Sequence, residues 1–249
     1  MLNNVLYVFD GSFFGFLTVI FECFQNKTFD CGIIEDDNVQ ESFYFQNVNV
    51  LTDEKKAGRV IAGIKSKISE KAFENIYFAF LSFEKGRFVD ILKYLELGFR
   101  VGKRIDDYKV YDFVVNVLRE CRASEHEAHM LSGFVRFSET KEKVLYSEIS
   151  PDNDVIEILA NHFSDRLPDE KWIIYDIKRK KCAAFKDGRI LILNDVENLN
   201  ISVSSDDAFW QNLWKDFFET IAVENRKSAK RQTQMLPKKF RKNMIEFLN

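Results

Sequence analysis

Cysteine and histidine are scarce in this chain of 249 residues, and their spacing excludes several kinds of site. The four cysteines, at positions 23, 31, 121 and 182, form no CxxC pair and no close triplet, which excludes a zinc knuckle and a cysteine-ligated iron–sulfur cluster. Unclustered cysteines of this kind predict a reducing cytoplasm. Three histidines leave no assignable Ser-His-Asp order, and no G-x-S-x-G elbow occurs. We therefore expect no cofactor and no metal.

Long hydrophobic runs are also missing. The apolar run over residues 13–24 is about a dozen residues long, whereas a membrane-spanning helix needs roughly 20. It follows Asp10 rather than a basic residue, and Glu22 interrupts it. We therefore expect neither a signal peptide nor a membrane span, and no membrane partner.

Positive charge is concentrated in one window, residues 226–242, although the whole chain has a formal net charge of −3. The window contains no acidic residue, and its eight cations leave a net −11 on the remaining residues. A basic segment on an acidic body is typical of contact with nucleic acid or a membrane surface, and a solvated basic helix has the same pattern. The candidate nucleic-acid-binding residues are Arg226, Lys227, Lys230, Arg231, Lys238, Lys239, Arg241 and Lys242.

Phenylalanine is abundant, with 25 residues in a chain that is 46% apolar. This number indicates core filling more than base stacking, and the chain is long enough for one large core or two smaller ones. In the first half, the apolar run Val5–Phe9 predicts a short buried strand, and alternation predicts a second strand over residues 42–50. Asp10, Gly11 and Ser12 predict a turn and a cap for a helix over residues 13–24. Helical spacing continues over residues 52–68, 72–83 and 87–97, with Gly98 as the last stop.

The second half has a different pattern. Helical spacing spans residues 106–131 with Gly133 as its stop, and residues 134–137 and 145–149 predict a strand pair. Ser150, Pro151 and Asp152 predict the start of a helix whose buried face includes His162. Residues 172–177, 181–185 and 189–193 predict further strands, and residues 206–221 predict an amphipathic helix.

These elements predict an α+β fold. The first half is rich in helices and contains a short strand unit, and in the second half amphipathic helices pack on a small antiparallel sheet. The predicted organisation is an N-terminal α/β segment over residues 1–84 and a C-terminal α+β domain over residues 85–249, which ends in the basic tail. One continuous globule is the alternative.

Two of the three histidines lie in the stretch EHEAHMLSGFVRF, residues 125–137. His126 and His129 are three residues apart, whereas the HExxH zinc motif needs four, so a zinc site here would require a distant acid as well. Convergence of the polar residues from separate elements would form an anion-binding pocket, and a structural ion-pair network is the alternative. The candidate pocket residues are Glu127, His129, Arg136, His162, Arg166, Asp176 and Arg179.

Several long motifs carry a resemblance to a known family. They are DGSFFGFLTVIFE, EAHMLSGFVRF, ISPDNDVIEILANHFSDR, WIIYDIKR and LWKDFFETIAVENRKSAKRQTQMLPKKF. On these motifs the chain resembles a bacterial family described as DNA metabolism proteins, whose C-terminal part is a domain of unknown function. The family pattern falls on the seven pocket residues and on Arg226 and Pro237, whereas Met130 and Ser228 depart from it.

The resemblance implies a role more than a reaction. Members are typically encoded beside a radical-SAM protein thought to act in DNA repair or modification, and some are fused to a uracil-DNA glycosylase. We therefore expect an accessory protein of DNA metabolism that binds nucleic acid or a radical-SAM partner. The alternatives are a protein-interaction module without DNA contact, and an enzyme whose His/Arg/Asp pocket acts on a nucleotide-type substrate by acid–base chemistry. The residues define neither a catalytic group nor an oligomeric state.

Overall fold

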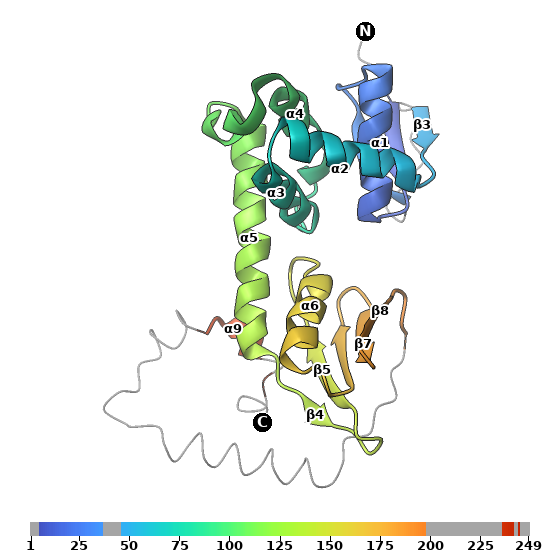
Figure 1. Ribbon diagram of the computed structural model, residues 1–249, viewed down its shortest axis with the longest axis vertical. Helices are drawn as coiled ribbons and strands as arrows, with labels where there is room; N and C mark the ends of the chain where they lie inside the picture. The colour runs from blue at the N-terminus through green and yellow to red at the C-terminus, as the bar shows by residue number, and fades with distance from the viewer. Residues whose placement is uncertain (1–4, 37–45, 198–235, 242–243, 245–249) are drawn as a thin grey trace, which may run out of the picture. The chain divides into compact units, whose positions relative to one another are not determined.

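The computed structural model describes residues 5–36, 46–197, 236–241 and 244 (Figure 1). The chain divides into two compact units, Met1–Glu125 and His126–Asn249, and helix α5, Asp112–Phe134, contributes to both. None of the described helices combines the length and the apolar character needed to cross a membrane. Three predicted features lie outside the described residues: strand residues 42–45, the helix over residues 206–221, and five cations of the basic window, Arg226, Lys227, Lys230, Arg231 and Lys242.

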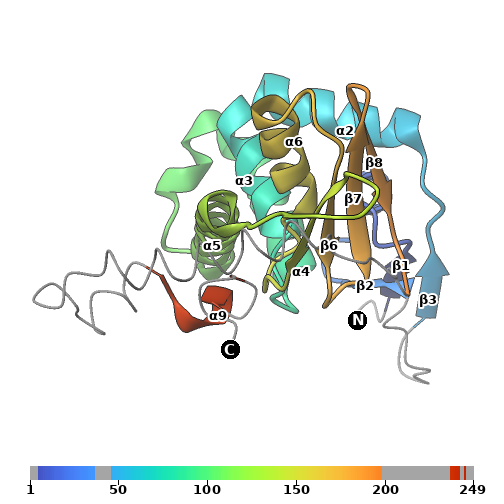
Figure 2. The same ribbon diagram turned by 90° about the horizontal axis from the view of Figure 1, so that it is seen from below.

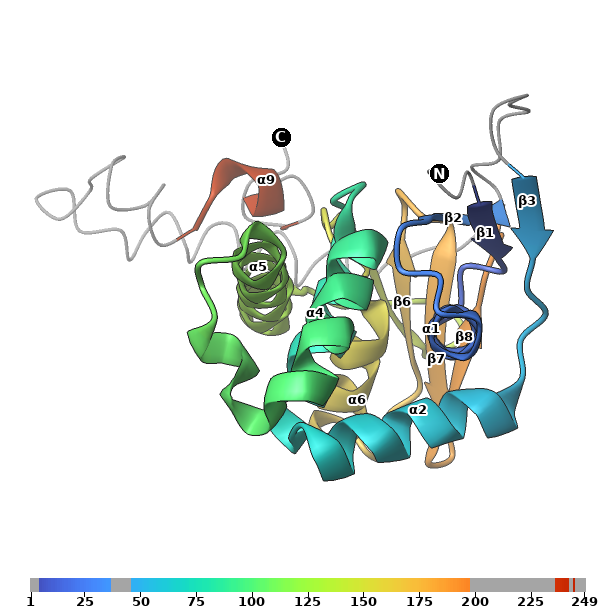
Figure 3. The same ribbon diagram turned by 90° about the horizontal axis from the view of Figure 1, so that it is seen from above.

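The N-terminal unit contains a three-stranded parallel sheet in the order β2-β1-β3 (Figure 3). The central strand β1, Val5–Phe9, forms as predicted, and β3 covers Gln46–Asn49. Strand β2, Gly32–Glu35, lies in a segment for which we predicted no strand. The described helices of this unit that precede α5 are α1 (Phe13–Asn26), α2 (Glu54–Lys67), α3 (Glu70–Phe80), α4 (Arg87–Val101) and the 3-10 helix η2 (Gly102–Asp107).

The turn between β1 and α1 is organised by Asp10. Its carboxylate accepts hydrogen bonds from the backbone N–H and the hydroxyl of Ser12, and from the hydroxyl of Thr52 at 2.7 Å. Ser12 Oγ in turn accepts from the backbone N–H of Gly15 at 2.9 Å, which caps α1. A Cβ on Gly15 would lie 2.2 Å from Asp10 Oδ1, so the turn requires glycine there. The predicted strand, turn and capped helix are thus confirmed.

Phenylalanine rings fill the core of the N-terminal unit. Phe9 on β1 and Phe16 on α1 are buried and contact each other, with ring centroids 5.9 Å apart. Phe80 and Phe88, from α3 and α4, pack against Phe16 at 5.4 and 5.1 Å. The interpretation of these aromatic residues as core filling is confirmed.

Two predicted helix ends are wrong because glycine alone does not stop a helix. Gly98 is buried inside α4, where a Cβ would lie 2.8 Å from Ile68 Cδ1, and close packing explains its small size. The helix ends three residues later because Gly102 adopts φ +66. In the same way α5 continues through Gly133 to Phe134, so residues 134–137 do not form the predicted strand.

The C-terminal unit contains a five-stranded sheet in the order β4-β5-β6-β7-β8. Strands β4 and β5 are labelled in Figure 1, and β6, β7 and β8 in Figure 2. Strands β5 and β6 are parallel because helix α6, Ile156–Arg166, carries the chain from one to the other, and the remaining pairs are antiparallel. The sheet is therefore mixed and not antiparallel throughout, which corrects the prediction, while the α+β fold class is confirmed. The strands are Ser138–Glu139, Leu145–Ile149, Trp172–Asp176, Lys181–Lys186 and Arg189–Leu193.

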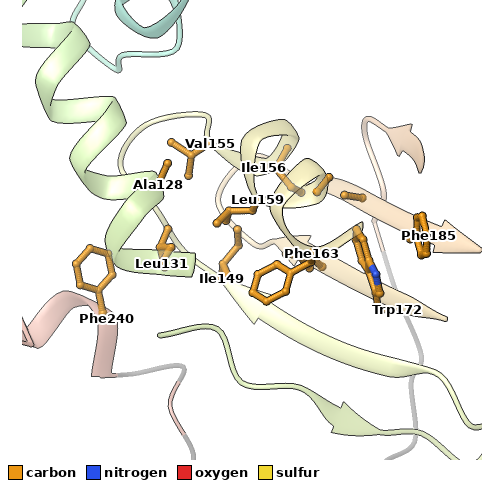
Figure 4. Packing of buried hydrophobic residues seen from close by; sticks show 13 residues of the cluster. Ala128, Leu131, Ile149, Val155, Ile156, Leu159, Phe163, Trp172, Phe185 and Phe240 are labelled. Atoms are coloured by element: carbon orange, nitrogen blue, oxygen red, sulfur yellow. The ribbon is translucent and has the colours of Figure 1, made fainter. Parts of the chain in front are cut away.

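One side of α6 packs on this sheet to form the core of the unit (Figure 4). Trp172 is fully buried and its ring stacks on Phe185, with centroids 5.2 Å apart. Phe240, from the short helix α9 (Lys238–Arg241), joins the same cluster. We predicted that His162 belongs to the buried face of this helix, and this is wrong: His162 is exposed, whereas its neighbour Phe163 is buried.

Candidate nucleic-acid interface

Asp176 ends strand β6 and holds the turn that follows it. The side chain is fully buried, and one carboxylate oxygen accepts from the backbone N–H groups of Lys178 and Arg179 at 2.9 and 3.3 Å. The other oxygen accepts from the Arg179 guanidinium at 3.0 Å. Burial raises the pKa of Asp176 above its ordinary value, and the ion pair with Arg179 opposes part of this shift. The Asp176 carboxylate therefore holds the backbone of the turn Lys178-Arg179-Lys180 in place through these hydrogen bonds.

The loop between β5 and α6 is held from both sides by charged groups. Arg179 donates to the carbonyl oxygens of Pro151 and Asp152. Glu127, a buried residue of α5, accepts from the backbone N–H groups of Asp152 and Asn153 at 3.1 and 2.8 Å. It also accepts from the side-chain amide of Asn153 at 2.8 Å. These contacts satisfy the loop backbone, and α6 begins only at Ile156 rather than at the predicted Ser150-Pro151-Asp152 start.

Asp152 joins two basic segments that are far apart in sequence. One carboxylate oxygen accepts from Lys178 Nζ at 2.6 Å, and the other accepts from Lys239 Nζ of α9 at 2.8 Å. Lys239 also donates to Glu127 at 2.6 Å. The hydrogen bonds from Lys178 and Lys239 lower the pKa of Asp152 to about 2. The β6–β7 turn and the described part of the basic tail are therefore fastened to the same carboxylate.

We call the cations of these two segments the basic surface. Lys178, Lys180, Lys238 and Lys239 are exposed, whereas Arg179 and Arg241 are half-buried. Lys180 pairs with Glu197, and the Arg241 guanidinium donates to the Leu236 carbonyl at 3.1 Å. The basic surface consists of Lys178, Arg179, Lys180, Lys238, Lys239 and Arg241.

The structure brings three of the seven predicted pocket residues together, namely Glu127, Asp176 and Arg179, around the β5–α6 loop. The other four residues are exposed or have other hydrogen-bonding partners. His129 is exposed on α5 and its carbonyl accepts from Ser132, while Arg136 donates to the carbonyls of Gly133 and Val135. On α6, His162 and Arg166 are both exposed.

Four members of this network were not among the predicted pocket residues: Asp152, Asn153, Lys178 and Lys239. A usable signal was the run Pro151-Asp152-Asn153-Asp154 directly after a buried strand, because the backbone of such a loop needs hydrogen-bonding partners. Within the described part of the chain, no group of three or more His, Cys, Asp or Glu side chains is placed to hold a metal ion.

Fold and site together define an α+β protein whose C-terminal unit carries a closed ion-pair network joined to a basic surface. The chain belongs to the family of the domain of unknown function DUF4130, whose model matches residues 85–246, about two thirds of the chain. This agrees with the C-terminal domain of unknown function that the resemblance implied, and the match includes α4 and α5. Comparisons with curated proteins and with solved structures found no match.

Proposed function

We propose that this protein is an accessory factor of DNA metabolism that binds nucleic acid through the basic surface of its C-terminal unit. The observation that carries the proposal is the double ion pair of Asp152 with Lys178 and Lys239. It gathers cations from the β6–β7 turn and from the tail into one positively charged area. Phosphate groups of nucleic acid are the partners that such an area attracts.

The charge balance of the basic surface supports binding of moderate strength. Four of its six cations, Lys178, Arg179, Lys180 and Lys239, pair with four carboxylates, those of Asp152, Asp176, Glu197 and Glu127. The six cations and four carboxylates together carry a net charge of +2. The two lysines that pair with Asp152 remain accessible to solvent, with 43% and 45% of the side chains of Lys178 and Lys239 exposed. The window of residues 226–242 contains five further cations, which lie outside the described residues.

A binding role agrees better with these contacts than acid–base catalysis does. Asp176 is closed off by Arg179 and by backbone N–H groups, and the donors to Glu127 and Asp176 do not include His129 or His162. A radical-SAM partner remains part of the proposal on the strength of the family resemblance. The four free thiols support a reducing cytoplasm as its location.

The test is a titration of fluorescently labelled duplex and single-stranded DNA with the full chain, followed by anisotropy at several salt concentrations. The logarithm of the binding constant should fall linearly with the logarithm of salt, with a slope of about −0.9 per phosphate contact. The double variant Lys180→Gln/Lys238→Gln removes two exposed cations and leaves the Asp152 ion pairs intact. We expect its slope to be smaller by about 1–2 and its affinity to be several-fold weaker.

The matched control is Lys85→Gln/Lys103→Gln, which removes the same charge from exposed positions of the N-terminal unit. If net charge alone governs binding, both double variants will weaken it equally, and the assignment to the basic surface is wrong. Absence of DNA binding at low salt would overturn the proposal as a whole.

A further inference from the structure

A groove in the N-terminal unit lies among helices α1, α2 and α4 and has a volume of about 340 Å³. Its apolar wall includes the half-buried rings of Phe21, Phe24 and Phe99. Phe24 and Phe99 meet edge to face, with centroids 5.2 Å apart. Small-molecule sites have volumes of roughly 300–1,000 Å³, so this groove suits a ligand with a single compact apolar body.

The floor of the groove is open because of a glycine. Gly63 lies in the middle of α2, and a Cβ placed there would lie 3.6 Å from the Phe99 ring, which is ordinary contact distance. A larger side chain at this position would therefore extend over the ring and fill the groove. Glycine weakens a helix, so its presence inside α2 is not explained by helix formation.

Two cations flank this glycine on the same face of α2. Arg59 and Lys67 lie four residues before and after Gly63, so they are about 12 Å apart along the helix axis. Both line the groove, both are exposed, and neither forms an ion pair with a carboxylate among the described residues. Their neighbours differ, because Lys56 pairs with Glu22 and Lys65 pairs with Glu70.

The Arg59 guanidinium lies over the Phe21 ring, 4.9 Å from the centroid. This contact keeps the charge at the edge of the aromatic wall and leaves its hydrogen-bond donors free for an anion. The groove thus combines an apolar wall with the positive charges of Arg59 and Lys67, one at each end.

We infer that this groove binds an organic anion with a compact apolar body, such as an aromatic carboxylate or sulfonate. The apolar body covers the rings of Phe24 and Phe99 next to Gly63, and the anionic group pairs with Arg59 or Lys67. The inference concerns the N-terminal unit and does not depend on nucleic-acid binding by the C-terminal unit.

The probe is 1-anilinonaphthalene-8-sulfonate, an aromatic anion whose fluorescence rises in an apolar site, titrated into the full chain. We expect saturable binding that falls about tenfold or more in Gly63→Leu, whose side chain fills the groove. The matched control is Gly58→Leu, on the same helix, because nothing lies within 4 Å of a Cβ at that position. This control should bind the probe like the wild type. Far-UV circular dichroism and the thermal midpoint of each variant report whether the fold is retained.

Charge recognition is tested with Arg59→Gln and Lys67→Gln, and with the neutral analogue N-phenyl-1-naphthylamine. We expect the anion to bind about three- to tenfold more weakly to these variants, while the affinity of the neutral analogue is unchanged. If Gly63→Leu fails to fold, Arg59→Gln and Lys67→Gln, which replace exposed residues, provide the test. Equal binding of the anion by wild type, Gly63→Leu and Arg59→Gln, or no saturable binding by the wild type, overturns the inference.

Discussion

Replacement of Glu127 by alanine should be among the most destabilising single changes in the C-terminal unit. The carboxylate is 3% exposed and accepts from the backbone N–H groups of Asp152 and Asn153, from the Asn153 amide and from Lys239. Glu127→Ala leaves these donors without their acceptor, and among the described residues it leaves Lys239 with only its ion pair to Asp152.

The magnitude follows from two opposing considerations. Loss of one partner of a buried ion pair costs about 3–5 kcal/mol, and each buried donor left without an acceptor costs about 1–3 kcal/mol. Water can reach Lys239, whose side chain is 45% exposed, so the lower end of the range applies. We expect a loss of roughly 3 kcal/mol in the free energy of unfolding for Glu127→Ala, and about half of that for Glu127→Gln, which retains one acceptor oxygen.

Urea unfolding followed by tryptophan fluorescence measures this loss. All three tryptophans lie in the unit His126–Asn249, so the signal reports on that unit. With a dependence of about 1–3 kcal/mol per molar urea, the midpoint should fall by roughly 1–3 M. The control is Glu125→Ala, an exposed position of the same helix, which should change the free energy by less than about 0.5 kcal/mol. A cost below about 1 kcal/mol for Glu127→Ala would refute the claim that this carboxylate holds the loop.

Three further predictions concern pH and packing. The pKa of Asp152 is lowered to about 2, so its contribution to the free energy of unfolding is complete above about pH 4 and is lost as the pH falls toward 2. Asp152→Asn should therefore reduce the change in unfolding free energy over that range by about 1 kcal/mol, a value discounted because the Asp152 side chain is 40% exposed. An acid unfolding profile identical to that of the wild type would contradict this. Burial, and then Asp90, raise the pKa of Glu120 to about 7, so its ionisation opposes folding as the pH rises from about 4.5 through 7. Glu120→Gln should stabilise the N-terminal unit by roughly 1–3 kcal/mol at pH 8 and not at pH 4, measured by hydrogen exchange of α5 peptides, and equal effects at both pH values would contradict the assignment. Gly98→Ala should lower the free energy of unfolding by about 1–3 kcal/mol through overlap with Ile68, whereas Gly58→Ala should raise it by about 0.5–1 kcal/mol; thermal unfolding of the pair tests the sign.

Elements defined by short-range pattern could be predicted from the sequence. Strand β1 with its Ser12-capped helix, and the strands from Trp172 to Leu193, have alternation or caps within a few residues of one another. The α+β class followed from these local signals. Strand β2 was missed because its four residues, Gly32–Glu35, are too few for a clear alternation.

Helix boundaries depended on contacts that the local pattern does not contain. Gly98 resembles a helix stop, but it lies inside α4, where Ile68 from the end of α2 packs against it. The helix ends instead at Gly102, which has a positive φ. Ser150-Pro151-Asp152 has the composition of a helix start, but its loop N–H groups are taken by Glu127 from another helix. A residue distant in sequence, Glu127, decides the conformation in the second case, whereas in the first the helix ends at a glycine four residues further along the chain.

The sequence by itself determined the fold class, most of the strands, the aromatic core and the concentration of cations near the C-terminus, because these follow from composition and short-range periodicity. The tertiary structure alone decided which charges meet. Glu127 contacts Lys239 across 112 positions, and Asp152 contacts the same lysine across 87. Ion pairs between such distant positions leave no periodic trace in a sequence, since each requires only one charged residue at each end and a fold that brings the two together.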